Sequence, residues 1–113
     1  MPLENLVDTL RAICADVFTQ GNAPDAYPAR FFTWWNSSTD NVKHYDNKPQ
    51  SCAWAADVNF YGTDPDDVYA TLEAARLALI AAGWKVNGKG YAVESGDASY
   101  TGRGFEATYI EKL

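Results

Sequence analysis

Hydrophobic and polar residues alternate most regularly between Ser51 and Tyr61, in the segment SCAWAADVNFY. Alternation over eleven residues with aromatic and β-branched side chains is typical of a strand. The side that carries Asp57, Asn59 and Tyr61 is the more polar one. The opposite side is the expected core face, and it is made of Cys52, Trp54, Ala56, Val58 and Phe60.

A helix is predicted directly after this strand, over Asp64–Ala82. Asp64 suits the N-cap position and Pro65 the first helical position, while Gly83 suits the stop. Trp84 is expected to fold back on the last turn. The apolar stripe that would face the sheet consists of Val68, Leu72, Ala75, Leu79 and Ala82.

Apolar residues at spacings of three and four predict another helix, from Pro2 to about Phe18. Charged residues lie on its opposite side, and Gly21 suits a stop. The predicted apolar face consists of Leu3, Leu6, Val7, Leu10, Ile13, Cys14, Val17 and Phe18.

The segment Ala29–Asn36 (ARFFTWWN) reads as a strand with large apolar side chains on both faces. Phe31 and Trp35 fall on one face, and Phe32 and Trp34 on the other. A strand of this kind is covered on both sides. In a chain of this size, we expect the core to cover one face and a partner to cover the other.

The next segment, Asn36–Gln50, is polar and has neither a helical nor a strand period. We expect a long flexible loop between the first two strands. Connections of this length are often functional. A disordered hairpin tip is an equally good interpretation.

Extended structure is expected again in the last third of the chain. Trp84–Val86 starts a strand, Asn87–Gly90 interrupts it as a tight hairpin or a bulge, and Tyr91–Glu94 resumes it. Tyr100–Glu111 is the final strand. Its two faces carry Phe105, Ala107 and Tyr109 on one side and Glu106, Thr108 and Ile110 on the other.

Together these elements predict an α+β fold in the order helix–strand–strand–helix–strand–strand. A mostly antiparallel sheet of about four strands would pack against two helices. The 113 residues are expected to form a single domain, residues 1–113, around one hydrophobic core.

Composition narrows the classes of function. The chain is 14% aromatic, which is rich for one small core and suggests a buried contact between subunits. Fifteen acidic residues against nine basic ones give a net charge of −6. This balance opposes non-specific binding to nucleic acid, because such binding comes mainly from Lys and Arg that neutralise phosphates.

Cys14 and Cys52 fall on the predicted core faces of different elements. Two cysteines fit neither a disulfide scaffold nor a zinc ligand set, so both are expected to be small core thiols in a reducing compartment. The N-terminus is charged at Glu4 and Asp8, and no apolar run approaches the length of a membrane span. We therefore expect a soluble protein without a membrane partner.

Catalytic motifs are scarce. His44 is the only histidine, and Asp40 and Asp46 lie near it in the polar segment, but nothing in their spacing positions a nucleophile or an oxyanion hole. The sequence has no HExxH motif, no paired CxxC and no Walker loop. We expect no catalytic residues, no metal site and no cofactor.

The order of these elements resembles the tail terminator, or head–tail joining, proteins of bacteriophages with long non-contractile tails. The likeness rests on Phe32–Trp35 before the polar loop and on Ala56–Asp64 entering the second helix. Leu77–Trp84 and the final strand, Tyr100–Tyr109, extend it. The interruption at Asn87–Gly90 departs from the family pattern.

The resemblance implies a structural protein of the virion tail, assembled in the cytoplasm of the bacterial host. Such proteins form a ring, usually a hexamer, that caps the tail tube and joins it to the head connector. The implied partners are copies of the chain itself, the tail tube protein and the head connector or completion protein. DNA would pass through the ring without specific binding, and no catalysis is implied.

Two other interpretations stay open. One is a small non-enzymatic adaptor, or another minor virion or head-completion protein, that binds proteins through an aromatic surface. The other is an enzyme centred on His44 with Asp40 or Asp46. The candidate contact residues are Phe32, Trp34 and Tyr61 at a subunit interface, and Lys43, His44, Tyr45 and Asp46 at the loop tip that would contact the tail or the connector.

Overall fold

The computed structural model describes residues 1–23, 26–45 and 48–112, with backbone only for 41–45 and 48–50. In these residues the elements follow one another as one helix, three strands, a second helix and three further strands. Their bounds are α1 (Pro2–Arg11), β1 (Val17–Thr19), β2 (Arg30–Tyr45), β3 (Lys48–Gly62), α2 (Pro65–Ala81), β4 (Lys85–Val86), β5 (Tyr91–Val93) and β6 (Thr101–Lys112).

The described strands form one six-stranded sheet in the order β1-β2-β3-β6-β4, with β5 also paired to β6. Only β1 and β2 run parallel, and the other pairs are antiparallel. The predicted α+β class is therefore confirmed. The sheet has more strands than the four expected, because β1 adds one and the third expected strand is split into β4 and β5.

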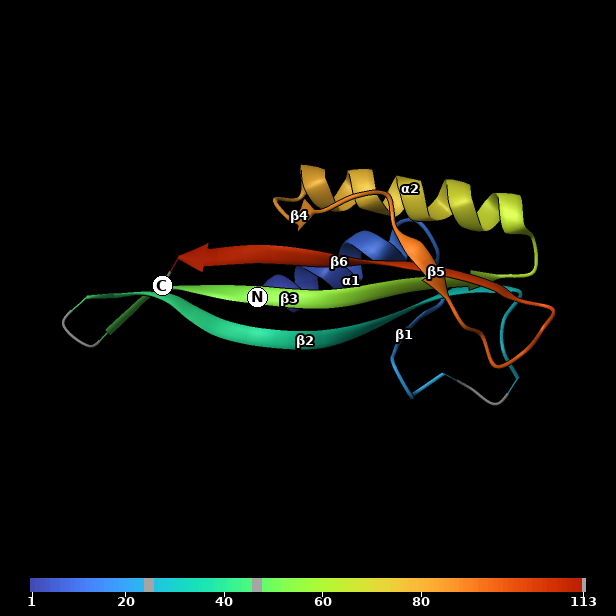
Figure 1. The fold of residues 1–113 in the computed structure, drawn as a ribbon, viewed down its shortest axis with the longest axis horizontal. Helices are drawn as coiled ribbons and strands as arrows, with labels where there is room; N and C mark the ends of the chain where they lie inside the picture. Colours follow the sequence, from blue (N-terminus) through green and yellow to red (C-terminus); the bar gives the residue numbers. More distant parts are fainter. Residues whose placement is uncertain (24–25, 46–47, 113) are drawn as a thin grey trace.

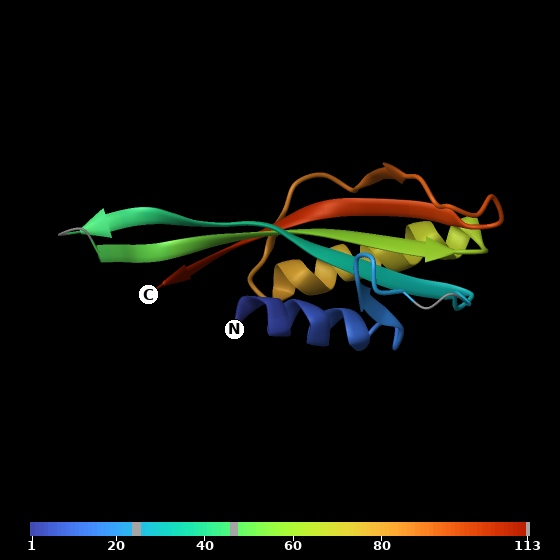
Figure 2. The same ribbon diagram turned by 90° about the horizontal axis from the view of Figure 1, so that it is seen from below.

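Both helices lie on the same side of the sheet (Figures 1 and 2). No helix in the described part of the chain covers the opposite side, which we call the open face. The molecule is elongated, at 53 × 26 × 22 Å, because β2 and β3 continue beyond the helices as an arm, which β6 accompanies as far as Lys112 (Figure 2). The fold is therefore a two-layer domain, with helices on one face of the sheet, and the projecting arm extends it.

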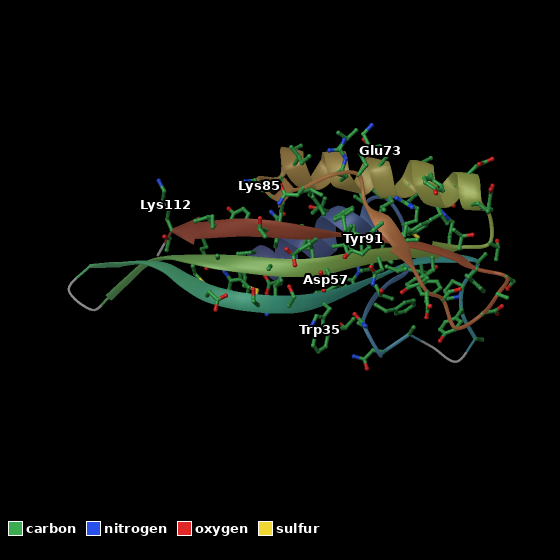
Figure 3. The ribbon with its side chains drawn as sticks, viewed as in Figure 1. Trp35, Asp57, Glu73, Lys85, Tyr91 and Lys112 are labelled. Carbon is green, nitrogen blue, oxygen red and sulfur yellow. The ribbon has the colours of Figure 1, made fainter. Side chains whose placement is uncertain are left out.

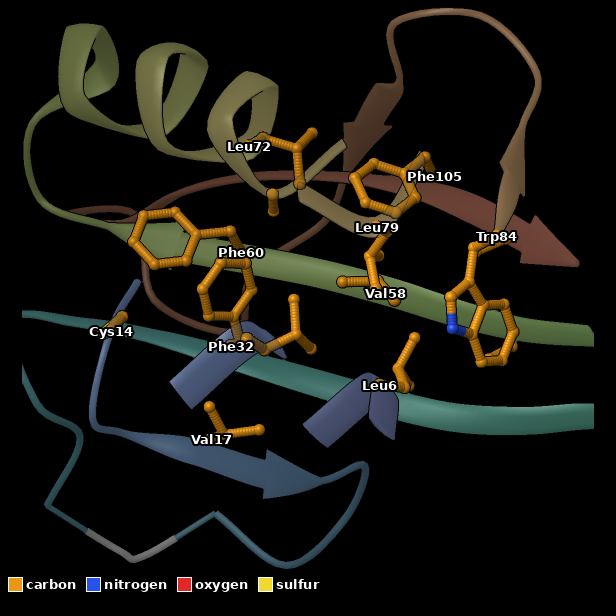
Figure 4. Packing of buried hydrophobic residues seen from close by; sticks show 14 of the residues in the cluster. Leu6, Cys14, Val17, Phe32, Val58, Phe60, Leu72, Leu79, Trp84 and Phe105 are labelled. Carbon is orange, nitrogen blue, oxygen red and sulfur yellow. The ribbon is translucent and has the colours of Figure 1, made fainter. Parts of the chain in front are cut away.

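The hydrophobic core lies between the helices and the sheet (Figure 4). Phe32 of β2 and Phe60 of β3 are fully buried, and their ring centroids are 4.6 Å apart. Trp54 packs against the core, which confirms the predicted core face of β3. The other core residues at 2% exposure or less are Leu6, Leu10, Ala56, Val58, Val68, Leu72, Ala75, Leu79, Trp84, Phe105 and Ala107.

Helix α2 begins and ends as its sequence predicts. The Asp64 carboxylate accepts a hydrogen bond from the Asp66 N–H at 3.0 Å. After the helix, Gly83 has a φ of 101°, and the Trp84 N–H returns to the Leu79 carbonyl at 2.9 Å. This is the pattern of a Schellman C-cap, in which a left-handed glycine ends the helix. It directs the Trp84 side chain into the core.

Helix α1 is shorter than predicted. It ends at Arg11, whereas the apolar spacing indicated a helix to about Phe18. Val17 and Phe18 instead belong to β1, and the Phe32 N–H donates to the Asp16 carbonyl at 2.9 Å. Val and Phe favour strands, and their backbone groups gain partners along the edge of β2.

The prediction of a long flexible loop over Asn36–Gln50 was wrong for the described residues. Strand β2 continues to Tyr45 and β3 starts at Lys48, with Thr39 opposite Trp54 and Asn41 opposite Cys52. The pairing shifts register between Asn36 and Ser38 and again after Asn41. Described residues 36–40 are all exposed, so this part of β2 has no buried face that would impose an apolar period.

The interrupted third strand is confirmed. β4 pairs with Ala107 and Thr108, and β5 pairs with Gly102–Gly104, so both segments lie along the same edge of β6. Phe105 and Ala107 are buried while Glu106 and Ile110 are exposed, which confirms the predicted faces of the final strand.

Candidate functional site

The open face is defined by residues that are opposite one another in three neighbouring strands. In β2 and β3, Thr33 is opposite Asn59 and Trp35 is opposite Asp57. Residues directly opposite in a sheet share a face. The open face therefore consists of Phe31, Thr33 and Trp35 of β2, Asp57, Asn59 and Tyr61 of β3, and Glu106, Thr108 and Ile110 of β6.

Two of the three predicted interface residues do not lie on this face. Phe32 is 0% exposed inside the core, and Trp34 is partly buried against the same core. The expectation that Phe32 contacts another subunit is therefore wrong for this fold, since no partner can reach a fully buried ring. Trp35 is half exposed and carries the aromatic surface of β2 instead, while Phe31 on the same face is buried. Tyr61 does lie on the open face, opposite Phe31.

A pair of carboxylates that has no ion-pair partner among the described residues lies near the middle of the open face. Asp57 and Glu106 are directly opposite each other in β3 and β6, an arrangement that destabilises a sheet. The exposed side chains of Trp35 and Tyr91 lie close by, and Trp35 points away from the side where α2 lies (Figure 3). Burial raises the pKa of Tyr91, and the charges of Asp57 and Glu106 raise it further.

Two glycines of β6 allow open-face side chains to lie flat across the sheet. A Cβ added at Gly102 would lie 2.8 Å from the Tyr61 ring, and one added at Gly104 would collide with the Asn59 amide. Gly in a strand interior often marks such a close approach. The alternation of glycine in Thr101–Phe105 is the sequence signal for this surface, and our sequence analysis missed it.

We expect Gly102→Ala to displace the Tyr61 ring, because real Cβ atoms do not approach other atoms within 2.8 Å. Overpacking of this kind lowers the free energy of unfolding by about 1–3 kcal/mol. Urea denaturation would measure it. Gly96→Ala is the matched control, since nothing lies within 4 Å of its added Cβ. Equal stability of the two variants would contradict the close packing of Tyr61 on β6.

An aromatic stack occupies one end of the open face. Tyr27, Phe31 and Tyr61 stack in that order, with centroid distances of 5.4 and 5.2 Å. Tyr100 packs edge-on against Phe31 at 6.1 Å, and its hydroxyl donates to the Pro28 carbonyl at 2.8 Å. The stack thus connects the segment before β2 to the start of β6.

A cavity of about 210 Å³, which we call the aromatic pocket, lies beside this stack. Five segments form its walls: Gln20, Gly21 and Ala23 after β1, Phe31 and Thr33 of β2, Tyr61 of β3, the turn 94–97, and Tyr27 with Tyr100. Both charged residues in these walls, Glu94 and Asp97, are acidic.

Two hydroxyl groups lie at the wall that β2 and β3 form. Burial raises the pKa of Tyr61 above its ordinary 10.0, and the neighbouring Thr33 and Asn59 side chains offset part of this rise. Thr33 Oγ1 does not reach hydrogen-bond geometry with Tyr61, however. It is buried without a partner among the described residues.

The turn that carries the acidic wall is held by its own hydrogen bonds. Ser99 donates to Asp97 Oδ1 from its hydroxyl at 2.7 Å and from its N–H at 2.9 Å. These bonds hold the pKa of Asp97 below its ordinary 3.8, so the carboxylate stays ionised at neutral pH. The Ser95 hydroxyl contacts the Asp97 and Tyr100 carbonyls at 2.6 and 2.9 Å.

A second exposed apolar surface lies on the opposite side of the molecule, on the outer side of α2. Tyr69, Leu77 and Ile80 are 57%, 54% and 42% exposed there. An α-helix that is apolar on its outer side as well as its inner side is typical of buried helices. We call this the α2 surface. Glu73 and Arg76 form an ion pair at 2.6 Å beside it.

The predicted loop-tip residues lie at the far end of the arm. Lys43, His44 and Tyr45 are the last described residues of β2, where His44 is opposite Pro49 and Tyr45 is opposite Lys48. The structure gives only their backbone, and Asp46 lies outside the described residues. Asp40 is opposite Ala53 in the middle of the arm. No catalytic arrangement can be derived from these positions.

Other kinds of site find no support in the residues that the structure describes. No group of three or more His, Cys, Asp or Glu side chains there is arranged to hold a metal ion. Within the same residues, no helix has the length and apolar character to cross a membrane. Cys14 and Cys52 are buried free thiols, as predicted.

Comparisons with known proteins give no family assignment. No protein-family model matches this sequence, and no curated protein is similar enough to count as a relative. The features of the fold that bear on function are the open face, the α2 surface, the arm and the aromatic pocket.

Proposed function

We propose that this protein is a ring-forming structural component of a phage tail, of the tail terminator class. It would cap the tail tube and join it to the head connector, with no catalysis. The observation that carries the proposal is the presence of two different exposed apolar surfaces. One contains Trp35 and Ile110 on the open face, and the other contains Leu77 on α2.

Closed rings need this arrangement. In a head-to-tail contact, one surface of a subunit meets a different surface of the next, and the contacts close into a ring if the rotation allows. A two-fold dimer, by contrast, uses a single surface twice. Helix α2 lies on one side of the sheet and the open face is the other side, so one copy can contact two neighbours at once.

The arm supports the same proposal. Its described part extends beyond the helices, so it stays accessible when neighbours occupy the two surfaces (Figure 1). Contact with the tail tube or the connector is therefore assigned to the arm. A hexamer is the ring size that the family resemblance favours.

The aromatic pocket favours a second candidate function, a protein-binding adaptor. An adaptor would act as a monomer or a dimer and would bind its partner through the rim of the pocket, where Tyr27 is half exposed and Tyr61 is partly exposed. Its mass in solution distinguishes it from a ring-forming subunit.

The test is the mass of the purified protein by sedimentation velocity, with negative-stain images of the protein alone and with tail tubes. Rings or closed oligomers are the expected result. A monomer at every concentration, both alone and with tail tubes, would rule out the ring.

Two variants test the use of two surfaces. We expect Trp35→Ser and Leu77→Ser each to weaken self-association at least about 30-fold, the loss typical of a buried apolar anchor. Each variant keeps one intact surface, so a mixture of the two should form heterodimers but no rings. Glu4→Gln, at an exposed position on α1, is the control. Rings formed by either single variant would contradict the head-to-tail contact.

A further inference from the structure

We infer that Asn87 and Gly88 form a site of spontaneous self-modification, at which the Asn87 amide is converted to aspartate or isoaspartate. Water is the one co-reactant, and this chain supplies every other reacting atom. The site lies apart from the surfaces of the proposed ring contact and does not depend on that function.

The reaction is a cyclisation followed by a hydrolysis. The main-chain nitrogen of Gly88 gives up its proton and attacks Cγ of Asn87. A new C–N bond forms, the bond from Cγ to the side-chain nitrogen breaks, and ammonia leaves with the proton. One water then opens the five-membered succinimide ring at either carbonyl carbon. Opening at one carbonyl gives aspartate and opening at the other gives isoaspartate, and both products carry one negative charge more than asparagine.

The sequence singles out this position. Asn87-Gly88 is the only asparagine–glycine pair in the 113 residues. Asparagine is a thermolabile residue, and a glycine after it removes the Cβ that would hinder the attacking nitrogen. Asn36, by contrast, is followed by Ser37, and its side-chain amide contacts the Thr39 hydroxyl at 3.1 Å. The amide of Asn36 is therefore held in place.

The segment that carries the pair loops out of the sheet. It connects β4 to β5 (Figure 1), with Val86 opposite Ala107 on one side and Tyr91 opposite Gly104 on the other. The four residues between these pairs lie opposite only two residues of β6. Two residues are therefore in excess, so the segment cannot continue the ladder of hydrogen bonds with β6.

The attacking nitrogen is unhindered in the described part of the chain. Asn87 and Gly88 are both exposed. Gly88 has a φ of 76°, and a Cβ built on it would meet nothing within 4 Å. Its N–H donates to no main-chain carbonyl among the described residues. A free nitrogen in open space can approach Cγ of the preceding side chain.

The surroundings also accept the products. Lys85 and Lys89 are exposed and lie two residues from Asn87 on either side, so the new carboxylate forms between two positive charges. Isoaspartate lengthens the main chain by one carbon, which a segment with excess residues accommodates. The protein should therefore accumulate as two folded forms that differ in charge.

The test incubates the purified protein in ¹⁸O-labelled water at mildly alkaline pH and follows it by isoelectric focusing and peptide mass spectrometry. We expect residue 87 to take up ¹⁸O as both aspartate and isoaspartate, at least about tenfold faster than Asn36. Isoaspartate is the signature of the ring, because direct hydrolysis gives aspartate alone. Aspartate alone at position 87, or equal conversion of Asn36 and Asn87, would overturn the inference.

Variants and a peptide separate the chemistry from the fold. Gly88→Ala should slow the conversion at least about tenfold, because the added Cβ hinders the nitrogen, and circular dichroism would verify its fold. Asn87→Gln should remove the acidic form. A synthetic peptide of residues 85–91 gives the rate without the fold, and the folded protein should react within about tenfold of it because the segment is open.

Three outcomes would contradict the site. The first is an unchanged rate in Gly88→Ala, and the second is an acidic form that persists in Asn87→Gln. The third is a folded protein that stays unmodified while the peptide reacts, which would mean that the fold holds the pair away from the reactive geometry.

Discussion

Replacement of Phe32 by Ala is expected to lower the free energy of unfolding by about 3–5 kcal/mol, the usual range for a buried Phe. The Phe32 ring is 0% exposed and lies against the Phe60 ring at 4.6 Å, so its removal leaves a cavity between β2, β3 and the helices. Urea denaturation followed by tryptophan fluorescence would measure the change.

Trp35→Ala is the matched control, because it removes a large ring from the same strand. Trp35 is 50% exposed on the open face, and its loss from the monomer should change stability by less than about 1 kcal/mol. A larger effect for Trp35 than for Phe32 would mean that the faces of β2 are exchanged, as a one-residue register shift would do.

Shortening the arm is expected to abolish attachment to the tail tube and leave the body folded. The variant lacks residues 44–50, which keeps the buried Ser51 and Cys52 that pair with β6, and joins Lys43 to Ser51 through Asn-Gly. These two residues are opposite each other, and Asn-Gly suits a two-residue hairpin turn. Co-sedimentation with purified tail tubes would measure attachment, and circular dichroism would verify the fold.

A second variant keeps the length of the arm and changes only its tip, with Ser in place of Lys43, His44 and Tyr45. If the tip residues make the contact, this variant should fail to attach as the shortened one does. Attachment by the tip variant alone would assign the contact to the backbone edge of the arm. Normal attachment by the shortened variant would exclude the arm as the docking element.

The parts of the fold that bury one face could be predicted from the sequence. The alternation in β3 and the stripe of α2 report burial directly, and Asp64, Pro65 and Gly83 mark the ends of the helix with local hydrogen bonds. The free cysteines on core faces follow from the same patterns.

The arm could not be predicted in this way, because apolar periodicity records contact with a core. Residues 36–40 are exposed although they are paired, so their polar sequence looks like a loop. Strand β1 was missed for a different reason. Val17 and Phe18 continue the apolar spacing of α1, and only the long-range pairing with β2 reveals their extended backbone.

The candidate site was predicted in part. The sequence indicates that β2 has two apolar faces, but it does not tell which one meets the helices, and Phe32 and Trp34 were assigned to the wrong side. The pairing of Phe31 with Tyr61 places Phe31 on the open face, which leaves Phe32 on the face that meets the helices. The aromatic pocket was not predicted, because its walls come from segments far apart in the chain.

The change of environment along β2 affects how the protein behaves at high concentration. Near Phe32–Trp34 the strand has neighbours on both edges, but β1 does not continue beside the arm. A bare strand edge invites fibril growth, and natural proteins disrupt such edges with irregular pairing. The register shifts at Asn36 and Asn41 lie in this uncovered stretch. Such shifts increase the local twist of the strand and disfavour pairing with the flat edge of another copy. Concentrated solutions of the protein should therefore resist amyloid formation, while a partner of matching shape can still pair with the arm.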